Sequence, residues 1–241
     1  MKKIVNWLCA AVMVVLSAAT PAAAQKDWPG FGRYAEKNAA LAPGSVKVVL
    51  IGDSITELWA STHYEFFTSR GYLGRGISGQ VSTQMLARFS QDVIALGPEV
   101  VVINAGTNDI AENQGTYNQE RTLEAIVAMV RLAQANGIKP VLSSVLPASG
   151  FRWRPEIKDA QEKITALNAR IREFAEANKL LYVDYYSALL SPDRTGLDTR
   201  YSKDGVHPVI DGYLLMEPLV TEAVDKALSS RKYGKLKVPR R

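Results

Sequence analysis

The chain alternates short apolar runs with longer amphipathic stretches. Four runs, at 46–51, 100–104, 140–145 and 180–184, are rich in Val, Ile and Leu and lack a regular polar alternation. This character predicts strands of a parallel sheet that is covered on both faces. Residues 72–77 form a fifth candidate strand, although they contain fewer apolar side chains.

The stretches between these runs have the apolar spacing of helices. Apolar side chains over 123–133 recur on one helical face, and Gly137 is well placed to end that helix. A second apolar stripe runs over 157–174. A last helix is predicted over about 210–228, with a kink or a restart at Pro218.

Two further helices complete the pattern. A short helix over 31–40 precedes the first strand, and another helix begins near Ile55. Strands that alternate with helices of this length predict one α/β domain with a parallel sheet of about five strands and helices on both faces. We assign residues 25–230 to this domain.

Residues 1–24 have the pattern of a cleavable secretory signal peptide. Two lysines precede an apolar run over 4–19, and a small-residue cleavage site ends at Ala24, before Gln25. The run is short for a membrane span, so we expect a secreted or periplasmic protein without stable membrane insertion after cleavage. An uncleaved N-terminal anchor is the alternative. The one cysteine, Cys9, lies in this segment, so the mature chain is expected to contain no disulfide.

Charge is distributed unevenly along the chain. The whole chain carries a formal net charge of +5, but residues 231–241 hold six basic residues and no acid, and residues 25–230 carry −3. The basic character therefore belongs to a C-terminal tail, and the domain is not expected to bind nucleic acid. The tail is either a solvated end or a contact for anionic lipid or polysaccharide.

Polar loop segments follow four of the predicted strands. In chain order they are Gly52–Ser54, 106–109, 147–155 and the loop that leads to His207. The carboxyl ends of parallel strands share one edge of the sheet, which is where open α/β sheets form their sites. We therefore expect these segments to converge.

Ser54 and His207 are candidates for nucleophilic catalysis. A serine hydroxyl needs a base to take its proton, and the base works best when a third group fixes its tautomer. Of the two histidines, His63 and His207, only His207 has an acid so placed, because Asp204 precedes it by three residues. The alternative is that Ser54 merely caps a helix in a capping box with Glu57.

Backbone and amide donors for an oxyanion are available near Ser54. The N–H groups of Ser54 and Gly79 and the side-chain amide of Asn108 are the candidates. Residues 74–79 match the G-x-G-x-x-G pattern, but they do not follow the first strand, so we expect no dinucleotide cofactor. With two histidines and no mature cysteine, we expect no metal site.

Four short motifs resemble the SGNH (GDSL-type) hydrolase family. They are GDSI at 52–55, GISG at 76–79, GTND at 106–109 and DGVHP at 204–208, in this order. Residues 75–88 resemble the branch that contains the α1 subunits of platelet-activating-factor acetylhydrolase and bacterial carbohydrate acetylesterases. The resemblance implies a serine esterase, and the signal-peptide pattern of residues 1–24 adds the expectation that it is secreted.

The resemblance implies a flavodoxin-like three-layer α/β/α sandwich. It implies Ser54, Asp204 and His207 as a catalytic triad, and Ser54, Gly79 and Asn108 as the oxyanion hole. Asp53 and Asp109 also fit the motifs, but we interpret them as structural turn or cap groups, because Asp side chains bond to nearby backbone. The related acetylhydrolase subunits form dimers, so a homodimer is compatible with the resemblance, although no stretch of the sequence identifies an interface.

The loop after the third strong strand offers candidate substrate contacts. Trp153 has the ring to stack on a sugar, and Arg152 and Arg154 have the charge to meet a uronate or sulfate. Alternatively, Trp153 packs on the domain and the arginines are solvated. Trp59 is expected in the core or a pocket wall, and His63 on the surface or packed.

The expected substrate is a short-chain acyl ester, above all an acetyl ester on a carbohydrate, because the chain has no insertion for a hydrophobic lid. One alternative is a lysophospholipase or short-chain lipid esterase with the same triad. An alternative of another class is a carbohydrate-binding protein without catalysis on the same fold.

Overall fold

Five parallel strands form one sheet at the centre of the molecule. The computed structural model describes residues 27–230, so the predicted signal peptide and basic tail lie outside the described residues. The sheet order is β2-β1-β3-β4-β5, with β1 paired on both sides. The strands are β1 (Val48–Gly52), β2 (Tyr72–Gly76), β3 (Val100–Ile103), β4 (Lys139–Ser143) and β5 (Leu181–Val183).

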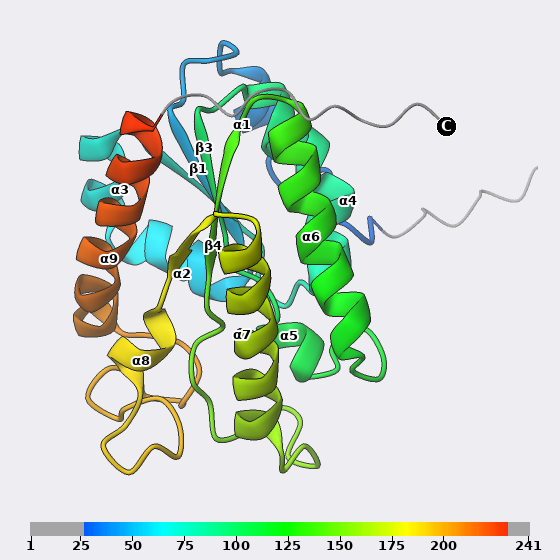
Figure 1. Cartoon of the computed structure of the whole chain (residues 1–241), viewed down its shortest axis with the longest axis vertical. Coiled ribbons are helices and arrows are strands. Elements are labelled where there is room, and N and C mark those ends of the chain that lie inside the picture. The colour runs from blue at the N-terminus through cyan, green and yellow to red at the C-terminus, as the bar shows by residue number, and fades with distance from the viewer. Residues whose placement is uncertain (1–26, 231–241) are drawn as a thin grey trace, which may run out of the picture.

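Helices cover both faces of this sheet, which confirms the predicted three-layer α/β/α arrangement (Figure 1). One face carries the larger core cluster with α4, α6 and α7, and the other carries α2, α3, α8 and α9. The helices are α1 (Ala35–Ala39), α2 (Ser54–Thr62), α3 (Tyr64–Arg70), α4 (Ser82–Asp92), a 3-10 turn (Ile94–Leu96), α5 (Thr107–Ile110), α6 (Gln119–Ala135), α7 (Ala160–Ala177), α8 (Tyr185–Leu189) and α9 (Ile210–Ser229).

Strand β1 shows why the apolar runs are continuous. Val49 and Ile51 belong to one core cluster, whereas Val48 and Leu50 belong to the other. Successive side chains of a strand point to opposite faces, and both faces are buried here. All five predicted strands are present, including 72–77, which forms the edge strand β2.

Some helix predictions are confirmed and others need correction. The helix over 123–133 is part of α6, and Gly137 follows it with a φ of +74°, as a helix-ending glycine does. Helix α1 is shorter than the predicted 31–40. Helix α9 continues through Pro218 as one element and is not restarted there.

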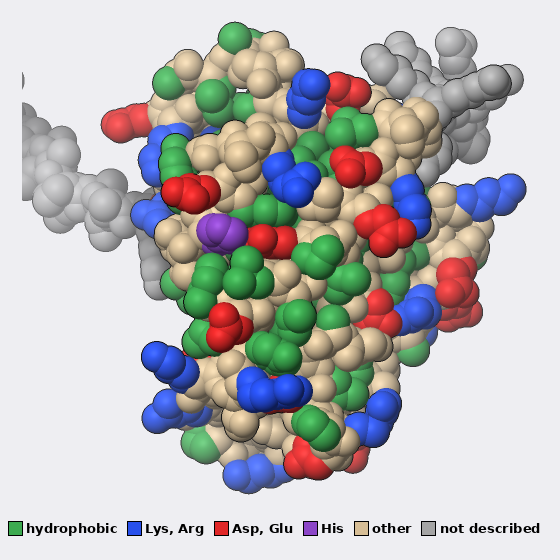
Figure 2. All heavy atoms as spheres, turned by 90° about the vertical axis from the view of Figure 1, so that its left-hand side faces the viewer, with side chains coloured by type: hydrophobic (Ala, Val, Ile, Leu, Met, Phe, Trp, Pro, Cys, Tyr) green, Lys and Arg blue, Asp and Glu red, His purple; other side chains and the backbone are tan. Residues whose placement is uncertain are grey.

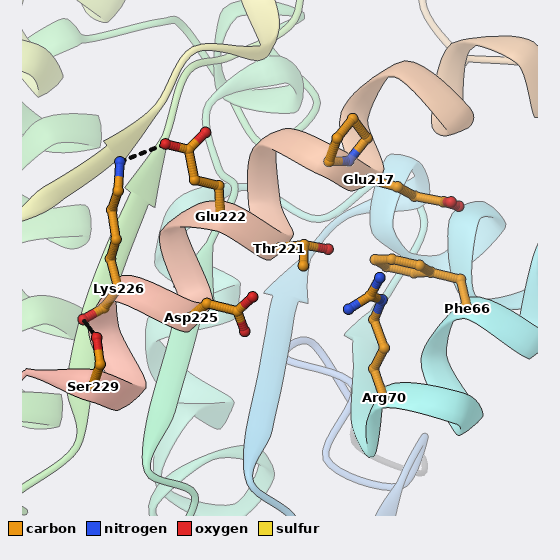
Figure 3. A pocket seen from close by; sticks show the side chains of 9 residues that line it. Phe66, Arg70, Glu217, Thr221, Glu222, Asp225, Lys226 and Ser229 are labelled. Carbon is orange, nitrogen blue, oxygen red and sulfur yellow. Dashed lines mark hydrogen bonds and ion pairs between the residues drawn. The ribbon is translucent and has the colours of Figure 1, made fainter.

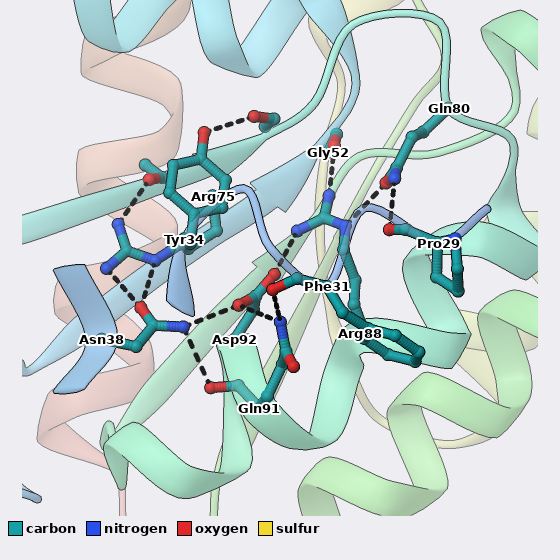
Figure 4. Close-up of polar contacts among 12 residues, drawn as sticks. Pro29, Phe31, Tyr34, Asn38, Gly52, Arg75, Gln80, Arg88, Gln91 and Asp92 are labelled. Atoms are coloured by element: carbon teal, nitrogen blue, oxygen red, sulfur yellow. Dashed lines mark hydrogen bonds and ion pairs between the residues drawn. The ribbon is translucent and has the colours of Figure 1, made fainter. Parts of the chain in front are cut away.

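Helix α4 was not predicted, because its buried face carries charge. Arg88 and Asp92 are fully buried and form an ion pair of 3.0 Å. The Arg88 guanidinium also donates to the Gln80 side chain at 2.6 Å and to the Gly52 carbonyl at 2.9 Å (Figure 4). The hydrogen bonds and the ion pair compensate the cost of burying the Arg88 charge. The charged side chains nevertheless interrupt the apolar periodicity by which a helix is identified in a sequence.

The amides of α4 and the loop before it hold the segment that precedes α1. Gln80 Nε2 donates to the Pro29 carbonyl at 2.6 Å, and Gln91 Nε2 donates to the Phe31 carbonyl at 2.7 Å (Figure 4). The N-terminal part of the domain is thus fixed beside the loop that joins β2 to α4. Within residues 27–230, no helix is both long enough and apolar enough to cross a bilayer.

Lys139, at the start of β4, anchors the end of α9. Its ammonium is buried and lies 2.7 Å from the carbonyl oxygens of Ala227 and Ser230. Carbonyls in the last turn of a helix lack intrahelical partners, and a cation complements the negative end of the helix dipole. Lys139 therefore adds a polar link between the sheet and the end of the last helix, beside their shared apolar core.

Replacing Lys139 is expected to destabilise the domain. Lys139→Met keeps most of the buried aliphatic stem but leaves helix-end carbonyls unpaired, so the free energy of unfolding should fall by about 1–3 kcal/mol. Urea denaturation measures this change. The control is Lys226→Met, which removes an exposed pair with Glu222 and should cost less than about 0.5 kcal/mol. Equal losses of unfolding free energy in Lys139→Met and Lys226→Met would contradict the role of Lys139 at the end of α9.

Candidate active site

Ser54 is the first residue of α2 and is separated from the end of β1 only by Asp53. The N-cap is Asp53, whose carboxylate accepts from the Ile55 N–H at 2.9 Å. Glu57 does not fold back on the helix end, because its carboxylate accepts from the N–H of Ser78 at 2.8 Å. The capping-box alternative is therefore wrong, and the Ser54 hydroxyl is free for another partner.

That partner is His207. Ser54 Oγ lies 2.8 Å from His207 Nε2, and His207 Nδ1 lies 2.7 Å from Asp204 Oδ2. The three side chains form one line of hydrogen bonds at the carboxyl end of β1. The sequence placed Ser54 and His207 in the same site, and the structure brings them into direct contact.

A tight turn fixes the acid relative to the imidazole. Asp204 Oδ1 accepts from the N–H of Val206 at 2.9 Å and from the N–H of His207 at 2.8 Å. Gly205 has a φ of +81°, a left-handed conformation in which a side chain would be strained. Burial opposes ionisation of Asp204, but the hydrogen bonds from the His207 ring and from these two N–H groups lower its pKa to about 2.

Asn108 lies next to this line, with both ends of its amide bonded. Its Nδ2 donates to Asp53 Oδ2 at 3.2 Å and to the Gln80 carbonyl at 3.1 Å. Its Oδ1 accepts from Asn113 Nδ2 at 2.8 Å. Asn108 is buried, and its nitrogen is therefore directed to the side of Asp53, the residue before Ser54.

The other predicted oxyanion donors are backbone N–H groups. Ser54 opens α2, so its N–H is among those without an intrahelical acceptor. Gly79 has a φ of +78°, and its carbonyl accepts from Asn113 Nδ2 at 3.3 Å. The left-handed conformation explains why glycine occupies this loop position.

Asp53 and Asp109 both bond within the fold. Asp53 is fully buried, and burial raises its pKa to about 6 although the Ile55 N–H favours its charge. Asp109 accepts from the N–H of Ser82 at 2.8 Å and from the Ser82 hydroxyl at 2.6 Å. Burial also raises the pKa of Asp109. These contacts are those of cap and turn groups.

Trp153 lies beside His207, and the two neighbouring arginines differ. The Trp153 ring centroid is 6.2 Å from that of His207, and the side chain is 41% exposed. Arg154 donates to the Glu112 carbonyl at 2.6 Å and pairs with Glu156 at 2.5 Å, so it holds the loop. Arg152 is exposed.

The first two glycines of the G-x-G-x-x-G stretch, Gly74 and Gly76, serve helix packing. A Cβ on Gly74 would lie 2.6 Å from the Ala60 Cβ, and one on Gly76 would lie 2.2 Å from the Glu57 nitrogen. Strand β2 therefore requires these glycines because α2 packs directly on it.

Trp59 and His63 lie outside this constellation. Trp59 is buried and stacks between Phe66, at 5.6 Å, and Tyr213, at 5.5 Å, so it is a core residue. His63 Nδ1 lies 2.5 Å from Glu217 Oε1. A groove of about 810 Å³ between α3 and α9 begins beside this pair and contains none of the predicted site residues (Figure 3).

The sequence did not identify Asn113 as part of the site. Its side chain bonds to Asn108, Gly79 and Trp153. The contact to Trp153 is a hydrogen bond of 2.9 Å from the Trp153 Nε1–H to Asn113 Oδ1. An asparagine in a turn is a common event, so no motif distinguishes it. Its importance depends on the tertiary contact between two loops.

Comparison with known proteins shows the family to which the chain belongs. The model of the GDSL-like lipase/acylhydrolase family matches residues 50–215. A solved structure from Bacteroides fragilis, assigned to the acylhydrolases, is 52% identical with a TM-score of 0.83 over 85% of this chain and 100% of that one. A GDSL-like lipase of Bacteroides thetaiotaomicron is also 52% identical, with a TM-score of 0.82 over 83% of this chain and 100% of that one.

A more distant relative has a named substrate. An acetylxylan esterase of Geobacillus stearothermophilus is 24% identical over 155 residues, which cover 60% of this chain and 67% of the esterase. The family match spans well over half of the chain, including the GDSI, GTND and DGVHP motifs. The chain therefore belongs to the GDSL-like lipase/acylhydrolase family and is a carboxylic ester hydrolase.

Proposed function

We propose that the protein is a serine esterase that uses a Ser54–His207–Asp204 triad. The observation that carries this proposal is the unbroken line of hydrogen bonds, 2.8 Å from Ser54 to His207 and 2.7 Å from His207 to Asp204. A serine next to an oriented imidazole is the arrangement that activates a hydroxyl for acyl transfer.

The mechanism follows from these contacts. His207 Nε2 takes the Ser54 proton while Ser54 Oγ attacks the ester carbonyl, and Asp204 stabilises the imidazolium and its tautomer. The imidazolium then donates its proton to the departing alcohol. Water attacks the acyl-enzyme with His207 again as base, which releases the acid and restores Ser54.

The oxyanion of each tetrahedral intermediate needs donors close to Ser54. The N–H groups of Ser54 and Gly79 are the backbone donors in this proposal, and the Asn108 amide is the third. The Asn108 nitrogen already lies 3.2 Å from Asp53. An oxyanion would therefore share an amide hydrogen that Asp53 holds in the free enzyme.

The alcohol side of the substrate is proposed to be a carbohydrate that carries acetyl groups. Trp153 supports this, because an aromatic ring that is 41% exposed beside His207 gives a sugar a surface for stacking. The similarity to an acetylxylan esterase is a second support. A signal-peptide pattern in residues 1–24 supports a secreted or periplasmic location, where polysaccharides are accessible.

A lipid ester is the second candidate. Ile210 and Leu214 follow His207 on one face of α9, and both are exposed, as is Leu58 on α2. Figure 2 shows hydrophobic side chains on the face to which α9 and α3 belong, with acidic and basic side chains between them. Exposed apolar side chains that follow Ser54 and His207 by a few residues in the sequence favour a short acyl chain or a lysolipid.

Removing the side chain of Ser54 or of His207 is expected to abolish hydrolysis. Ser54→Ala and His207→Ala should lower kcat/KM for p-nitrophenyl acetate by about 10⁶-fold, because both groups act in the same step. Ser61→Ala and His63→Ala are the matched controls on the same helix and its end, and they should keep the activity. Activity retained by Ser54→Ala would refute the nucleophile assignment.

The substrate class is tested with esters of increasing length and with natural acceptors. Acetate, butyrate and octanoate esters of p-nitrophenol are compared with acetylated xylo-oligosaccharides and lysophosphatidylcholine. A preference for acetyl esters with acetate released from the oligosaccharides supports the carbohydrate proposal. A preference for octanoate and the lysolipid supports the lipid candidate instead.

Asp204→Asn is expected to lower kcat and to remove the stability that the ionised Asp204 carboxylate adds near neutral pH. The wrong His207 tautomer should lower kcat by about 10⁴-fold. The folded protein lowers the pKa of Asp204 from its ordinary value of 3.8 to about 2, which adds stability above pH 4 that is lost as the pH falls toward 2.

Urea denaturation of both proteins between pH 2 and pH 7 tests this linkage. The excess stability of the wild-type protein over Asp204→Asn should be constant above about pH 5 and should shrink toward pH 2. A difference that does not vary over this range would show that the hydrogen bonds from the His207 ring and from the N–H groups of Val206 and His207 do not hold the Asp204 carboxylate in solution.

A further inference from the structure

The turn at Glu112–Asn113 lies between the proposed oxyanion donors and the substrate loop. Asn113 Nδ2 lies 2.8 Å from Asn108 Oδ1 and 3.3 Å from the Gly79 carbonyl. Its Oδ1 accepts from Trp153 Nε1 at 2.9 Å. One half-buried amide therefore bonds to two oxyanion-hole residues and to the ring beside His207.

The bond to Asn108 Oδ1 fixes which end of the Asn108 amide faces the reaction. An amide group has a donor end and an acceptor end, and only the donor end stabilises an oxyanion. Because Asn113 donates to the oxygen, the nitrogen of Asn108 is held toward Asp53. Loss of this bond leaves the orientation to the donations from the Asn108 nitrogen to Asp53 and to the Gln80 carbonyl, and the Asn108 oxygen is then unpaired. An amide that turned would present its oxygen, which would repel the developing charge.

Asn113 is itself held by a strained turn. Glu112 has a φ of +53°, which is costly for a residue with a side chain. The Asn113 N–H donates to the Asn108 carbonyl at 3.1 Å, and Arg154 donates to the Glu112 carbonyl at 2.6 Å. The loop of Trp153 and Arg154 is thus attached to this turn at two consecutive residues.

We propose that Asn113 is a positioning residue that links the oxyanion hole to the substrate loop. This inference rests on the proposed function, in which Asn108 and Gly79 bind the oxyanion and Trp153 contacts the alcohol. Its donor end holds Asn108 and Gly79, and its acceptor end holds the Trp153 indole. The two ends predict separate kinetic effects, since one contact serves the transition state and the other serves binding.

Two substitutions separate the two ends. Asn113→Asp keeps the size of the side chain and its acceptor for Trp153, but it cannot donate to Asn108. We expect kcat to fall by about 10- to 100-fold, because a misdirected oxyanion donor costs up to its full contribution, while KM changes less than about threefold. Trp153→Phe keeps an aromatic ring but removes the indole N–H that bonds to Asn113 Oδ1, so the ring is no longer held in place. The contacts from Asn113 to Asn108 and Gly79 remain. This variant should therefore raise KM for acetylated xylo-oligosaccharides and leave kcat within about twofold.

The pair must also be coupled. Trp153→Phe should raise KM by a smaller factor in an Asn113→Ala background than in the wild-type protein, because the hydrogen bond between the two side chains is already absent. Gln114→Ala is the control, since Gln114 is the exposed neighbour that accepts from Trp28 Nε1, and its kinetics should match the wild type. Circular dichroism and the unfolding midpoint establish that each variant is folded.

The outcomes distinguish this inference from the proposed function. Wild-type hydrolysis that Ser54→Ala abolishes establishes the function first. If Asn113→Asp then retains kcat within twofold of the wild type, or if Trp153→Phe and Asn113→Ala are fully additive, the positioning role is refuted. If Ser54→Ala remains active, the proposed function fails, and the inference about Asn113 fails with it.

Discussion

The contact between Ser54 and His207 joins positions that are 153 residues apart, and the site depends on it. A parallel sheet makes it possible, because all five strands end at the same edge. The packing of α9 on α2 then aligns the two residues: the Tyr213 hydroxyl donates to the Ile55 carbonyl at 3.0 Å, and the Tyr213 ring stacks on Trp59 at 5.5 Å. Ile55 directly follows Ser54, and Trp59 lies less than two helical turns further along α2.

A buried polar network supports the other side of the site. Arg88 carries a full charge in the core, which is costly to desolvate, but it is paired with Asp92 and bonded to Gly52 and Gln80. The Gln80 carbonyl accepts in turn from Asn108. The end of β1 and the loop that contains Gly79 are thus held by the same guanidinium. Rigid support of this kind is what preorganised oxyanion donors require.

The architecture could be predicted from the sequence because apolar runs report burial on both faces of a sheet. The line from Ser54 through His207 to Asp204 was also predictable, since residues in that pattern have a recognised chemistry. Helix α4 was missed because Arg88 and Asp92 occupy its core face. Asn113 was missed because its role arises where two loops meet, and no local pattern records such a contact.

The most direct test of the account is covalent labelling by diethyl p-nitrophenyl phosphate, followed by peptide mapping. Serine attack on phosphorus releases p-nitrophenolate and leaves a diethylphosphoryl group on the nucleophile. We expect one label per chain, on Ser54, with labelling strongly slowed in His207→Ala because the base that takes the serine proton is lost. A label on another residue, or a rate unaffected by the loss of His207, would contradict it.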